Sequence, residues 1–436
     1  MSVAQTARFA CGLYARRLAL AYYGYLRRDP MCRLHLRGGR DDPYAIYDEI
    51  RRAGTLVPTR MGTELPRRLR RTARQMVYVT ASHAVSTAVL RDRRFGVRSR
   101  ALSGLTFDMS FLDRDPPDHT RLRRLAQPAF GPRRIAAYRP RVEARVDELL
   151  DAAAAGGEFD LVSAFAAPLP IAVITDLLGV PDADTARFAE HGAVIGGALG
   201  GVRSLTHAAQ LKAASHELRA LFERLFALRR AEPADDVVSR IVAAEGDQIT
   251  PDEMLPLCIL LLVAGFETTV NLIGNAVHAL LRHPGQWAEL CADPAGLAPA
   301  AIEETLRWDP PVQRTARYAR EDLTLAGRTV VRDQFVVTLL AAANRDPAVY
   351  PDPDVFDLHR TPAVDHLAFS AGVHYCVGAP LARMEATIAL QRLAERMPGL
   401  TRAGALRRRP SGIVRGPLHF PVRCGTRVLN SVGPSA

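Results

Sequence analysis

The segment Phe369-Ser-Ala-Gly-Val-His-Tyr-Cys-Val-Gly-Ala-Pro-Leu-Ala-Arg383 places one cysteine, Cys376, in a glycine-containing loop directly before a long helical pattern. A thiolate at a helix N-terminus is stabilised by unpaired N–H groups and the helix dipole, which lowers the thiol pKa and favours metal binding. Gly372 and Gly378 lack a side chain, so a flat group can approach the backbone there. A purely structural cysteine would leave these glycines and His374 unexplained. We therefore expect Cys376 to be a metal ligand.

The type of metal site follows from what surrounds this cysteine. No second cysteine and no pair of histidines lies at zinc spacing. A single thiolate suits axial ligation of haem iron, where it donates electron density that favours O–O cleavage. The segment resembles the haem-binding loop of the cytochrome P-450 family, Phe-x-x-Gly-x-x-x-Cys-x-Gly, and matches every fixed position from Phe369 to Gly378. His374 and the Ala-Pro-Leu-Ala-Arg that follows the loop are similar to the soluble bacterial branch.

The resemblance implies a fold and a cofactor. The fold would be mainly α-helical with a small β-rich lobe, a triangular domain around a buried heme b (iron protoporphyrin IX). Residues 41–436 would form this single domain, preceded by a basic, amphipathic extension over residues 1–40. The sequence itself predicts a first helix over residues 42–55 and short strands near 56–57 and 76–79. Glycines at 196–201 predict a break between two helices.

A second informative segment is a long apolar helix. Thr250-Pro251-Asp252-Glu253 is a helix start with a capping box and Pro in the first turn, and the apolar pattern continues to Arg282. Such a helix would be roughly 45 Å long and would cross the domain. Glu267, Asn271 and Asn275 interrupt it, so we expect a core helix and no integral membrane segment.

This helix contains Ala264-Gly265-Phe266-Glu267-Thr268-Thr269, where a glycine and a buried acid both carry a free-energy cost. Local violations of this kind indicate a functional site. The segment resembles the family's oxygen-activation motif, Ala/Gly-Gly-x-Asp/Glu-Thr. The resemblance implies that Thr268 stabilises oxygen during activation, that Glu267 relays protons, and that Ala264 and Gly265 adjoin the haem. The helix would bulge near Gly265. Alternatively, Thr268 only bonds to a backbone carbonyl.

Several basic residues are candidates for binding the haem propionates. His119 and Arg123 lie four apart on a predicted helix, so they point the same way, and both donate well to carboxylates. The resemblance implies that they bind propionates together with Arg317 and His374. Taken without the other two residues, His119 and Arg123 would also be explained by a solvent-exposed helix face. Of their neighbours, we expect Arg121 and Arg124 to face solvent or a redox partner.

An acid–base pair at i, i+3, Glu304 and Arg307, shares one helix face. Alone this is a weak signal, but it resembles the Glu-x-x-Arg pair of the family. The resemblance implies a buried structural ion pair that is tied to Arg345 and holds the cysteine loop in place. It would perform no chemistry.

Substrate contacts are implied only by position in the family, and ordinary packing would explain the same residues. The candidates lie on a loop over the haem, on the sheet side and in a C-terminal hairpin: Leu105, Phe107, Met109, Val312, Gln313, Thr315, Ile413 and Val414.

Composition limits the class of protein. The formal net charge is +11, but Lys212 is the only lysine and the arginines are scattered. We therefore expect no nucleic-acid partner, although a basic face could attract an acidic redox protein. The six cysteines show no framework spacing, which favours reduced thiols and a cytoplasmic location. Residues 4–28 contain five arginines and no acid; a helix packed on the body explains them better than a membrane-surface helix or a transit peptide.

Together these features predict a haem-thiolate monooxygenase of the soluble bacterial type. It would insert one oxygen atom from O2 into an apolar secondary metabolite. Electrons would come from NAD(P)H through a ferredoxin and a ferredoxin reductase. The alternatives are a peroxide-dependent or non-oxygenating haem-thiolate enzyme and a non-catalytic haem-binding sensor.

Overall fold

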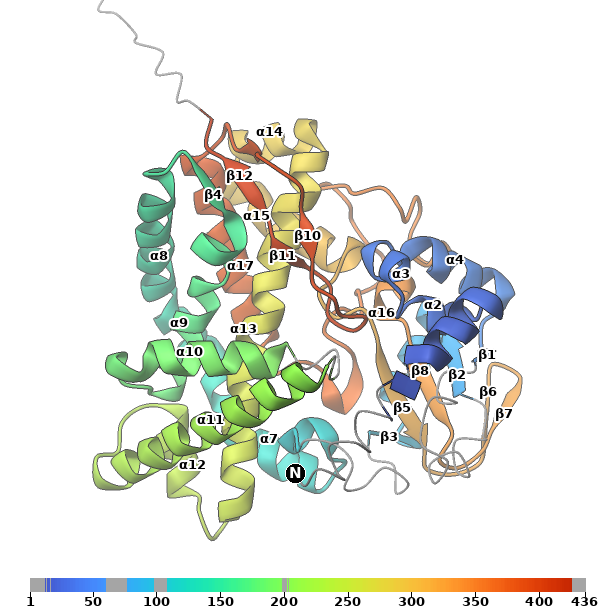
Figure 1. Cartoon of the computed structure of the whole chain (residues 1–436), viewed down its shortest axis with the longest axis horizontal. Coiled ribbons are helices and arrows are strands. Elements are labelled where there is room, and N and C mark those ends of the chain that lie inside the picture. Colours follow the sequence, from blue (N-terminus) through green and yellow to red (C-terminus); the bar gives the residue numbers. More distant parts are fainter. Residues whose placement is uncertain are drawn as a thin grey trace, which may run out of the picture.

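One long helix, α13 (Pro251–Arg282), runs through the centre of the molecule (Figure 1). The computed structural model describes residues 12, 14–15, 17–59, 77–97, 108–197, 202 and 204–425. The predicted start of α13 is confirmed, because Thr250 N–H donates to Glu253 Oε2 at 3.0 Å within a capping box. Although α13 is apolar enough to cross a membrane, 83% of its most apolar window is buried inside the protein. It is a core helix.

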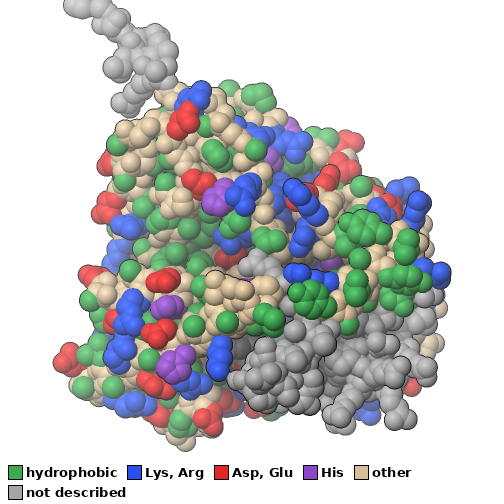
Figure 2. Space-filling model, in the orientation of Figure 1, with side chains coloured by type: hydrophobic (Ala, Val, Ile, Leu, Met, Phe, Trp, Pro, Cys, Tyr) green, Lys and Arg blue, Asp and Glu red, His purple; other side chains and the backbone are tan. Residues whose placement is uncertain are grey.

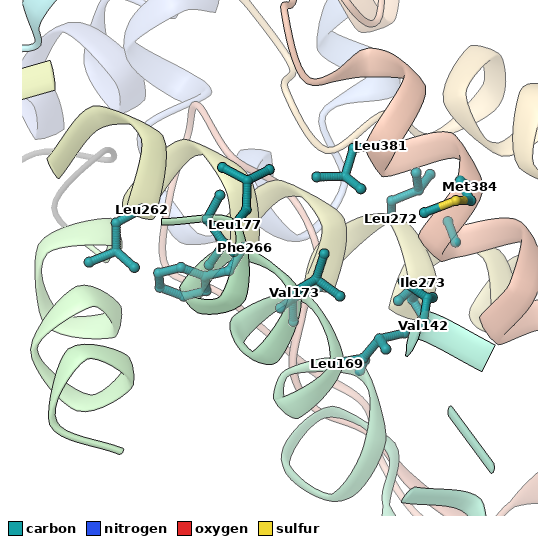
Figure 3. Close-up of a cluster of buried hydrophobic side chains, with 14 of the residues drawn as sticks. Val142, Leu169, Val173, Leu177, Leu262, Phe266, Leu272, Ile273, Leu381 and Met384 are labelled. Carbon is teal, nitrogen blue, oxygen red and sulfur yellow. The ribbon is translucent and has the colours of Figure 1, made fainter. Parts of the chain in front are cut away.

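Helices α9 (Pro168–Leu178) and α17 (Ala379–Arg396) pack directly on α13 through aliphatic side chains, and α8 (Pro132–Ala154) packs on both of them. Figure 3 shows Val142 of α8, Val173 of α9 and Leu381 of α17 converging on the α13 side chains Leu272 and Ile273. Helix α17 begins three residues after Cys376. Because α17 packs on α13, this apolar packing also fixes the position of α13 relative to the cysteine loop.

Two further helices, α10 (Asp182–Gly196) and α11 (Leu205–Ala231), lie across α13 (Figure 1). The predicted break falls between them, and its residues 198–201 lie outside the described part of the chain. The other helical segments are η1 (Tyr22–Leu26), α2 (Pro30–Arg33), α3 (Arg37–Asp41), α4 (Tyr44–Ala53), α6 (His83–Arg91), η2 (Ser110–Asp113), α7 (Asp118–Ala126), η3 (Gln127–Phe130), η4 (Val162–Ala166), α12 (Val237–Ala243), α14 (Pro284–Ala292), α15 (Pro294–Trp308), α16 (Leu340–Ala343) and η5 (Gly372–His374).

The β-structure is concentrated in one lobe, whose sheet has the strand order β1-β2-β8-β5-β3. Strands β2 and β8 are parallel, and the other neighbours are antiparallel. The predicted first helix and strand pair are confirmed in α4, β1 and β2. The strands are β1 (Val57–Thr59), β2 (Val77–Thr80), β3 (Phe95–Gly96), β4 (Glu158–Asp160), β5 (Thr315–Ala319), β6 (Leu323–Leu325), β7 (Arg328–Val330), β8 (Phe335–Thr338), β9 (Thr401–Arg402), β10 (Arg407–Arg408), β11 (Pro417–His419) and β12 (Pro421–Arg423).

The N-terminal residues are divided between core and surface. Met31 and Cys32 are completely buried, and Met31 packs with Ile46 of α4 in the core of the β-rich lobe. Residues 30–41 are thus part of that lobe. Before them, Leu18 and Tyr25 remain 71% and 67% exposed. The expected boundary at residue 40 does not coincide with a change in packing.

The visible surface mixes acids and arginines without one large area of a single sign (Figure 2). This mixture agrees with the scattered arginines of the sequence. Many of these side chains form surface ion pairs, such as Arg141 with Asp176 at 2.7 Å.

Candidate functional site

The cysteine loop lies between η5 and α17. Cys376 N–H donates to the Phe369 carbonyl at 3.0 Å, and the amides of Gly378 and Ala379 bond to the sulfur. The thiol keeps accessible surface, yet protein surrounds it, and this burial raises the pKa of Cys376. The two amides and the Arg123 guanidinium act in the opposite direction. The expected lowering of the thiol pKa is therefore wrong for the protein alone, because burial outweighs the helix N-terminus.

The two loop glycines have different roles. Gly372 has φ +70°, and a Cβ there would lie 2.3 Å from the Leu90 carbonyl oxygen, so the protein fold itself requires glycine. A Cβ on Gly378 would meet only Phe130, at 3.7 Å. Gly378 thus leaves room beside the sulfur, which fits the close approach of a flat group.

A group of basic side chains gathers beside this loop. His119 of α7 and His374 of η5 lie with ring centroids 4.4 Å apart, and Arg317 of β5 is 5% exposed. Both ring nitrogens of His119 and Nε2 of His374 are buried without a hydrogen-bond partner among the described residues. Arg317 donates to Thr315 Oγ1 and to the Ala316 carbonyl, which are both neutral acceptors.

Electrostatics in this group point to a missing anion. Burial and the neighbouring cations lower the pKa of His374 to about 3, and burial lowers that of Arg317 to about 10. Burial also lowers the pKa values of His119 and Arg123. Buried donors of this kind are normally paired with an acid. A haem with two propionates, ligated by the Cys376 sulfur, fits these residues.

On α13, the motif presents a small accessible face. Ala264 is exposed and Thr268 partly exposed, whereas Phe266, Glu267 and Thr269 are buried. Ala264 and Thr268 are therefore the side chains of the motif that a bound group could contact. The Thr268 hydroxyl donates to the Ala264 carbonyl at 3.0 Å, which is the back-bonded arrangement that the sequence left as an alternative.

The expected bulge of α13 near Gly265 is absent, and the helix is continuous from Pro251 to Arg282. A Cβ on Gly265 would lie 2.8 Å from Ile174 Cδ1 of α9. The glycine therefore allows close packing of α9 against a regular helix, and this contact fills the space beside it.

The buried acid of the motif has a partner that the sequence analysis missed. Arg409 Nη1 lies 2.9 Å from Glu267 Oε1, and Arg409 Nε donates to Asn271 Oδ1 at 3.0 Å. The sequence does contain a run of three arginines near the C-terminal hairpin, Arg407-Arg408-Arg409. The run alone does not indicate which of the three side chains reaches α13.

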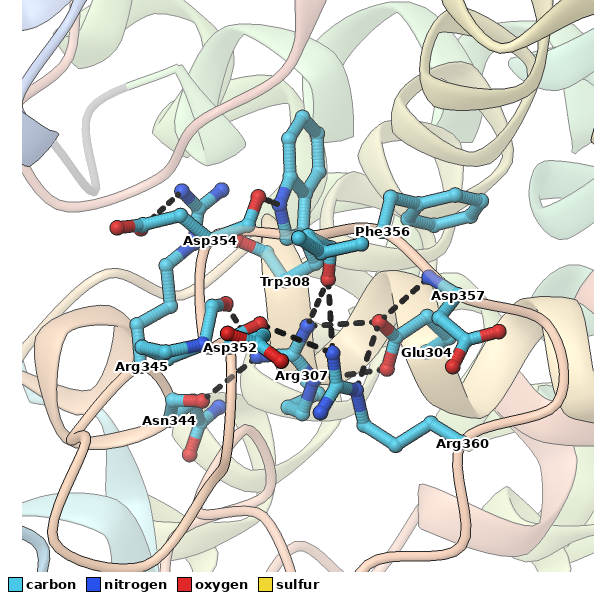
Figure 4. A network of polar contacts seen from close by, with 12 residues as sticks. Glu304, Arg307, Trp308, Asn344, Arg345, Asp352, Asp354, Phe356, Asp357 and Arg360 are labelled. Carbon is cyan, nitrogen blue, oxygen red and sulfur yellow. Dashed lines mark hydrogen bonds and ion pairs between the residues drawn. The ribbon is translucent and has the colours of Figure 1, made fainter.

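The Glu304–Arg307 pair is buried and bidentate, with Nε–Oε2 and Nη2–Oε1 distances of 2.7 Å (Figure 4). Arg307 also donates to the Asn344 carbonyl at 3.2 Å, and Asn344 Oδ1 accepts from Leu367 N–H at 2.7 Å. Leu367 immediately precedes the cysteine loop. The pair therefore supports the loop through Asn344.

The third member of this network is Arg360, whose Nε lies 3.2 Å from Glu304 Oε1. Arg345 is not bonded directly to Glu304 or Arg307. It lies beside them in the network, where it donates to the Trp308 carbonyl at 2.7 Å and pairs with Asp354 at 3.2 Å (Figure 4). Asp354 stands between Pro353 and Val355, whose carbonyls bind Arg307.

Arg124 is exposed as expected, and the Arg121 side chain is 35% exposed. Arg121 also has a structural contact, because its Nη2 lies 2.7 Å from Glu253 Oε1 and so connects α7 to the first turn of α13.

The candidate substrate contacts divide into three groups. Leu105 and Phe107 lie outside the described residues, and Met109 is partly buried against the core. Val312 pairs with buried Val414 in an isolated β-bridge, beside partly exposed Ile413.

The third group comprises Gln313 and Thr315, which bond to other protein groups. Gln313 is 3% exposed, accepts from Tyr47 Oη at 3.0 Å and donates to the Pro310 carbonyl at 2.7 Å. Its expected role in substrate binding is wrong, because both ends of its amide hold the protein together. Thr315, which is partly exposed, accepts from Arg317 at 3.1 Å.

Several known proteins are similar to this chain over most of its length. The profile of the family described as Cytochrome P450 matches residues 296–397. The chain is 38% identical to the cytochrome P450 monooxygenase PikC of Streptomyces venezuelae, over 88% of this chain and 91% of PikC. It is 43% identical to the mycinamicin IV hydroxylase/epoxidase of Micromonospora griseorubida, over 71% and 79%. The crystal structure of ligand-free CYP164A2 from Mycobacterium smegmatis is similar with a TM-score of 0.80 and 42% identity, over 90% and 99%.

Proposed function

The chain belongs to the cytochrome P450 family as a haem monooxygenase, and from this premise we propose that it oxidises an apolar secondary metabolite in the cytoplasm. Electrons come from NAD(P)H through a ferredoxin and its reductase. One C–H bond, one O2, two electrons and two protons yield one C–OH group and one water.

Cys376 would hold the iron of heme b, and this group would supply the activation of O2. His119, Arg123, Arg317 and His374 would bind its propionates. The observation that carries this proposal is that both ring nitrogens of His119 and Nε2 of His374 are buried without a hydrogen-bond partner among the described residues. Cys376 follows His374 by two residues, lies directly before α17 and is exposed. Gly378 leaves the porphyrin room beside that thiol.

On α13, Thr268 is the accessible polar side chain of the motif. Its hydroxyl, which donates to Ala264 here, donates to oxygen during activation. Glu267, the next residue along the helix, passes protons to this position. Carboxylates are effective proton donors and acceptors when they are held close to the reacting atoms.

Three of the candidate substrate contacts are apolar and partly accessible, namely Met109, Val312 and Ile413. Such side chains suit an apolar substrate. The relative named mycinamicin IV hydroxylase/epoxidase supports a secondary metabolite as the substrate class. A spectral titration of the haem protein with macrolactones and fatty acids tests this choice, and shifts with fatty acids alone would contradict it.

The decisive experiment is the carbon monoxide spectrum of the reduced protein. We expect absorbance at about 450 nm from thiolate ligation, and its loss in Cys376→Ser. Cys291→Ser in α14 is the matched control and keeps the wild-type spectrum. An intact, haem-loaded protein that absorbs near 420 nm would refute the ligand assignment. NADPH-dependent O2 consumption with a surrogate ferredoxin and reductase excludes a sensor, and a requirement for peroxide would indicate the peroxide-dependent alternative.

A further inference from the structure

Polar side chains form a row along one side of the otherwise apolar helix α13. Glu267, Asn271, Asn275 and His278 lie three or four residues apart and are all buried. Residues at this spacing share one helix face. The C-terminal segment that contains β10 and β11 lies against this face (Figure 1), and Asn275 Nδ2 donates to its Arg415 carbonyl at 3.2 Å.

Arg409 bridges two members of this row. Its Nη1 lies 2.9 Å from Glu267 Oε1, and its Nε donates to Asn271 Oδ1 at 3.0 Å. The Glu267 and Arg409 side chains are 4% and 18% exposed. A guanidinium that is bound at two points has a fixed orientation, and so does the carboxylate oxygen that it contacts.

The backbone around Arg409 is built for this close approach. Arg409 N–H donates to the Gly416 carbonyl at 3.0 Å across the hairpin. A Cβ on Gly416 would lie 2.1 Å from Asn271 Oδ1, so a larger residue would push the hairpin away from α13. The short distance between Arg409 and Glu267 therefore depends on the hairpin as well as on the two side chains.

The second carboxylate oxygen faces a different element. A Cβ on Gly196, the last residue of α10, would lie 3.5 Å from Glu267 Oε2. With Oε1 fixed by Arg409, Oε2 is directed toward the end of α10. Displacement of a reacting group by about 1 Å can reduce a rate roughly a hundredfold, so this orientation matters for proton transfer.

We propose that Arg409 is a positioning residue for oxygen activation, which holds Glu267 in the orientation from which it passes protons toward Thr268. This inference rests on the proposed function of Glu267. Both protons of the reaction come from solvent through Glu267, and both electrons come from NAD(P)H. Arg409 stays protonated throughout and is not itself a proton donor.

Arg409→Met tests this role, with Arg408→Met as the matched control. Arg408 precedes Arg409 and lies 3.9 Å from a different acid, Asp309, so its loss perturbs the same hairpin without touching Glu267. The first readout is NADPH-driven O2 consumption by the haem protein with a surrogate ferredoxin and reductase and the macrolactone that shifts the spectrum of the wild-type protein. The second is guaiacol oxidation with hydrogen peroxide, which already carries two electrons and two protons.

We expect Arg409→Met to reduce O2 consumption roughly tenfold and to leave peroxide-driven guaiacol oxidation at the wild-type rate. Arg408→Met should change neither rate. Arg409→Lys keeps the positive charge but not the two-point contact, so an intermediate rate is expected. In a Glu267→Gln background, Arg409→Met should cause no further loss, because the two residues act together.

Wild-type O2 consumption in Arg409→Met would overturn the proposal, as would equal losses in both Met variants or multiplied losses in the double variant. Loss of guaiacol oxidation in Arg409→Met together with NADPH-driven activity would indicate a structural role and would also overturn it. Failure of the proposed function is distinguishable, since the wild-type protein would then lack the absorbance at about 450 nm and NADPH-driven O2 consumption.

Discussion

Arg307 Nη2 lies 2.7 Å from Glu304 Oε1, and the two side chains are only 2% and 4% exposed. An ion pair at this depth is strongly coupled to the surrounding fold, because removal of one partner leaves an uncompensated charge. Here the pair also bonds to three backbone carbonyls, at Asn344, Pro353 and Val355. These contacts connect α15 to the segment before the cysteine loop.

Glu304→Gln should therefore reduce the free energy of unfolding by about 3–5 kcal/mol, and the protein should purify with less haem. Urea denaturation and haem content per chain measure the two effects. Glu395→Gln removes the partly exposed pair with Arg392 and serves as control, with a change below about 1 kcal/mol. Equal effects of the two substitutions would contradict the structural role of Glu304.

Arg317→Met should separate the stability of the protein from haem binding. A hydrogen bond to a charged group contributes about 1.5–3 kcal/mol, so haem affinity should fall roughly tenfold or more. The haem-free protein should be equally or more stable, because a buried guanidinium without an acid carries a free-energy cost. Haem titration and thermal unfolding of the haem-free form measure both. Exposed Arg328→Met is the control, and an unchanged haem affinity in Arg317→Met would refute the propionate assignment.

Thr268→Ala should uncouple electron use from oxygenation, and Thr269→Ala supplies a closely matched control. Both hydroxyls donate to the carbonyl four residues before them, at 3.0 and 3.1 Å, but Thr268 is partly exposed whereas Thr269 is buried. We expect the product formed per NADPH to fall roughly tenfold or more in Thr268→Ala alone. Product and peroxide yields are the measurements. Equal coupling in the two variants would remove Thr268 from the proposed proton path.

The buried carboxyl group of Glu385 in α17 should make the free energy of unfolding depend on pH. Its side chain is 2% exposed, Oε2 has no partner among the described residues, and burial raises its pKa from 4.5 to about 8. Between these values the folded protein holds a proton that the unfolded chain has released, so this group makes stability fall as pH rises. Glu385→Gln should flatten that slope and stabilise the protein at pH 8, by roughly 1–3 kcal/mol. Thermal unfolding at pH 5 and 8 tests this, and an unchanged slope would contradict the buried carboxyl.

Local sequence signals predicted α13 and the cysteine loop, because capping residues, apolar periodicity and the glycine pattern act within a few residues of one another. The same kind of signal correctly placed Glu304 and Arg307 on one helix face. It did not indicate Arg360, since only tertiary packing decides that this residue reaches Glu304. It also gave no indication of Arg409, whose contact with Asn271 spans 138 residues. The Cys376 pKa was misjudged because burial depends on the whole fold.

The polar row on α13 joins parts of the chain that are made at different times. Asn271 and Asn275 emerge from the ribosome long before Arg409 and Arg415, their partners 138 and 140 residues later. Both amides also have partners nearer in the sequence, because Asn271 donates to the Glu267 carbonyl and Asn275 to the Asp309 carbonyl. What the hairpin adds is the Arg409 guanidinium, which binds Asn271 Oδ1 and Glu267. Since closing so long a loop is slow, we expect these two contacts to form late in folding.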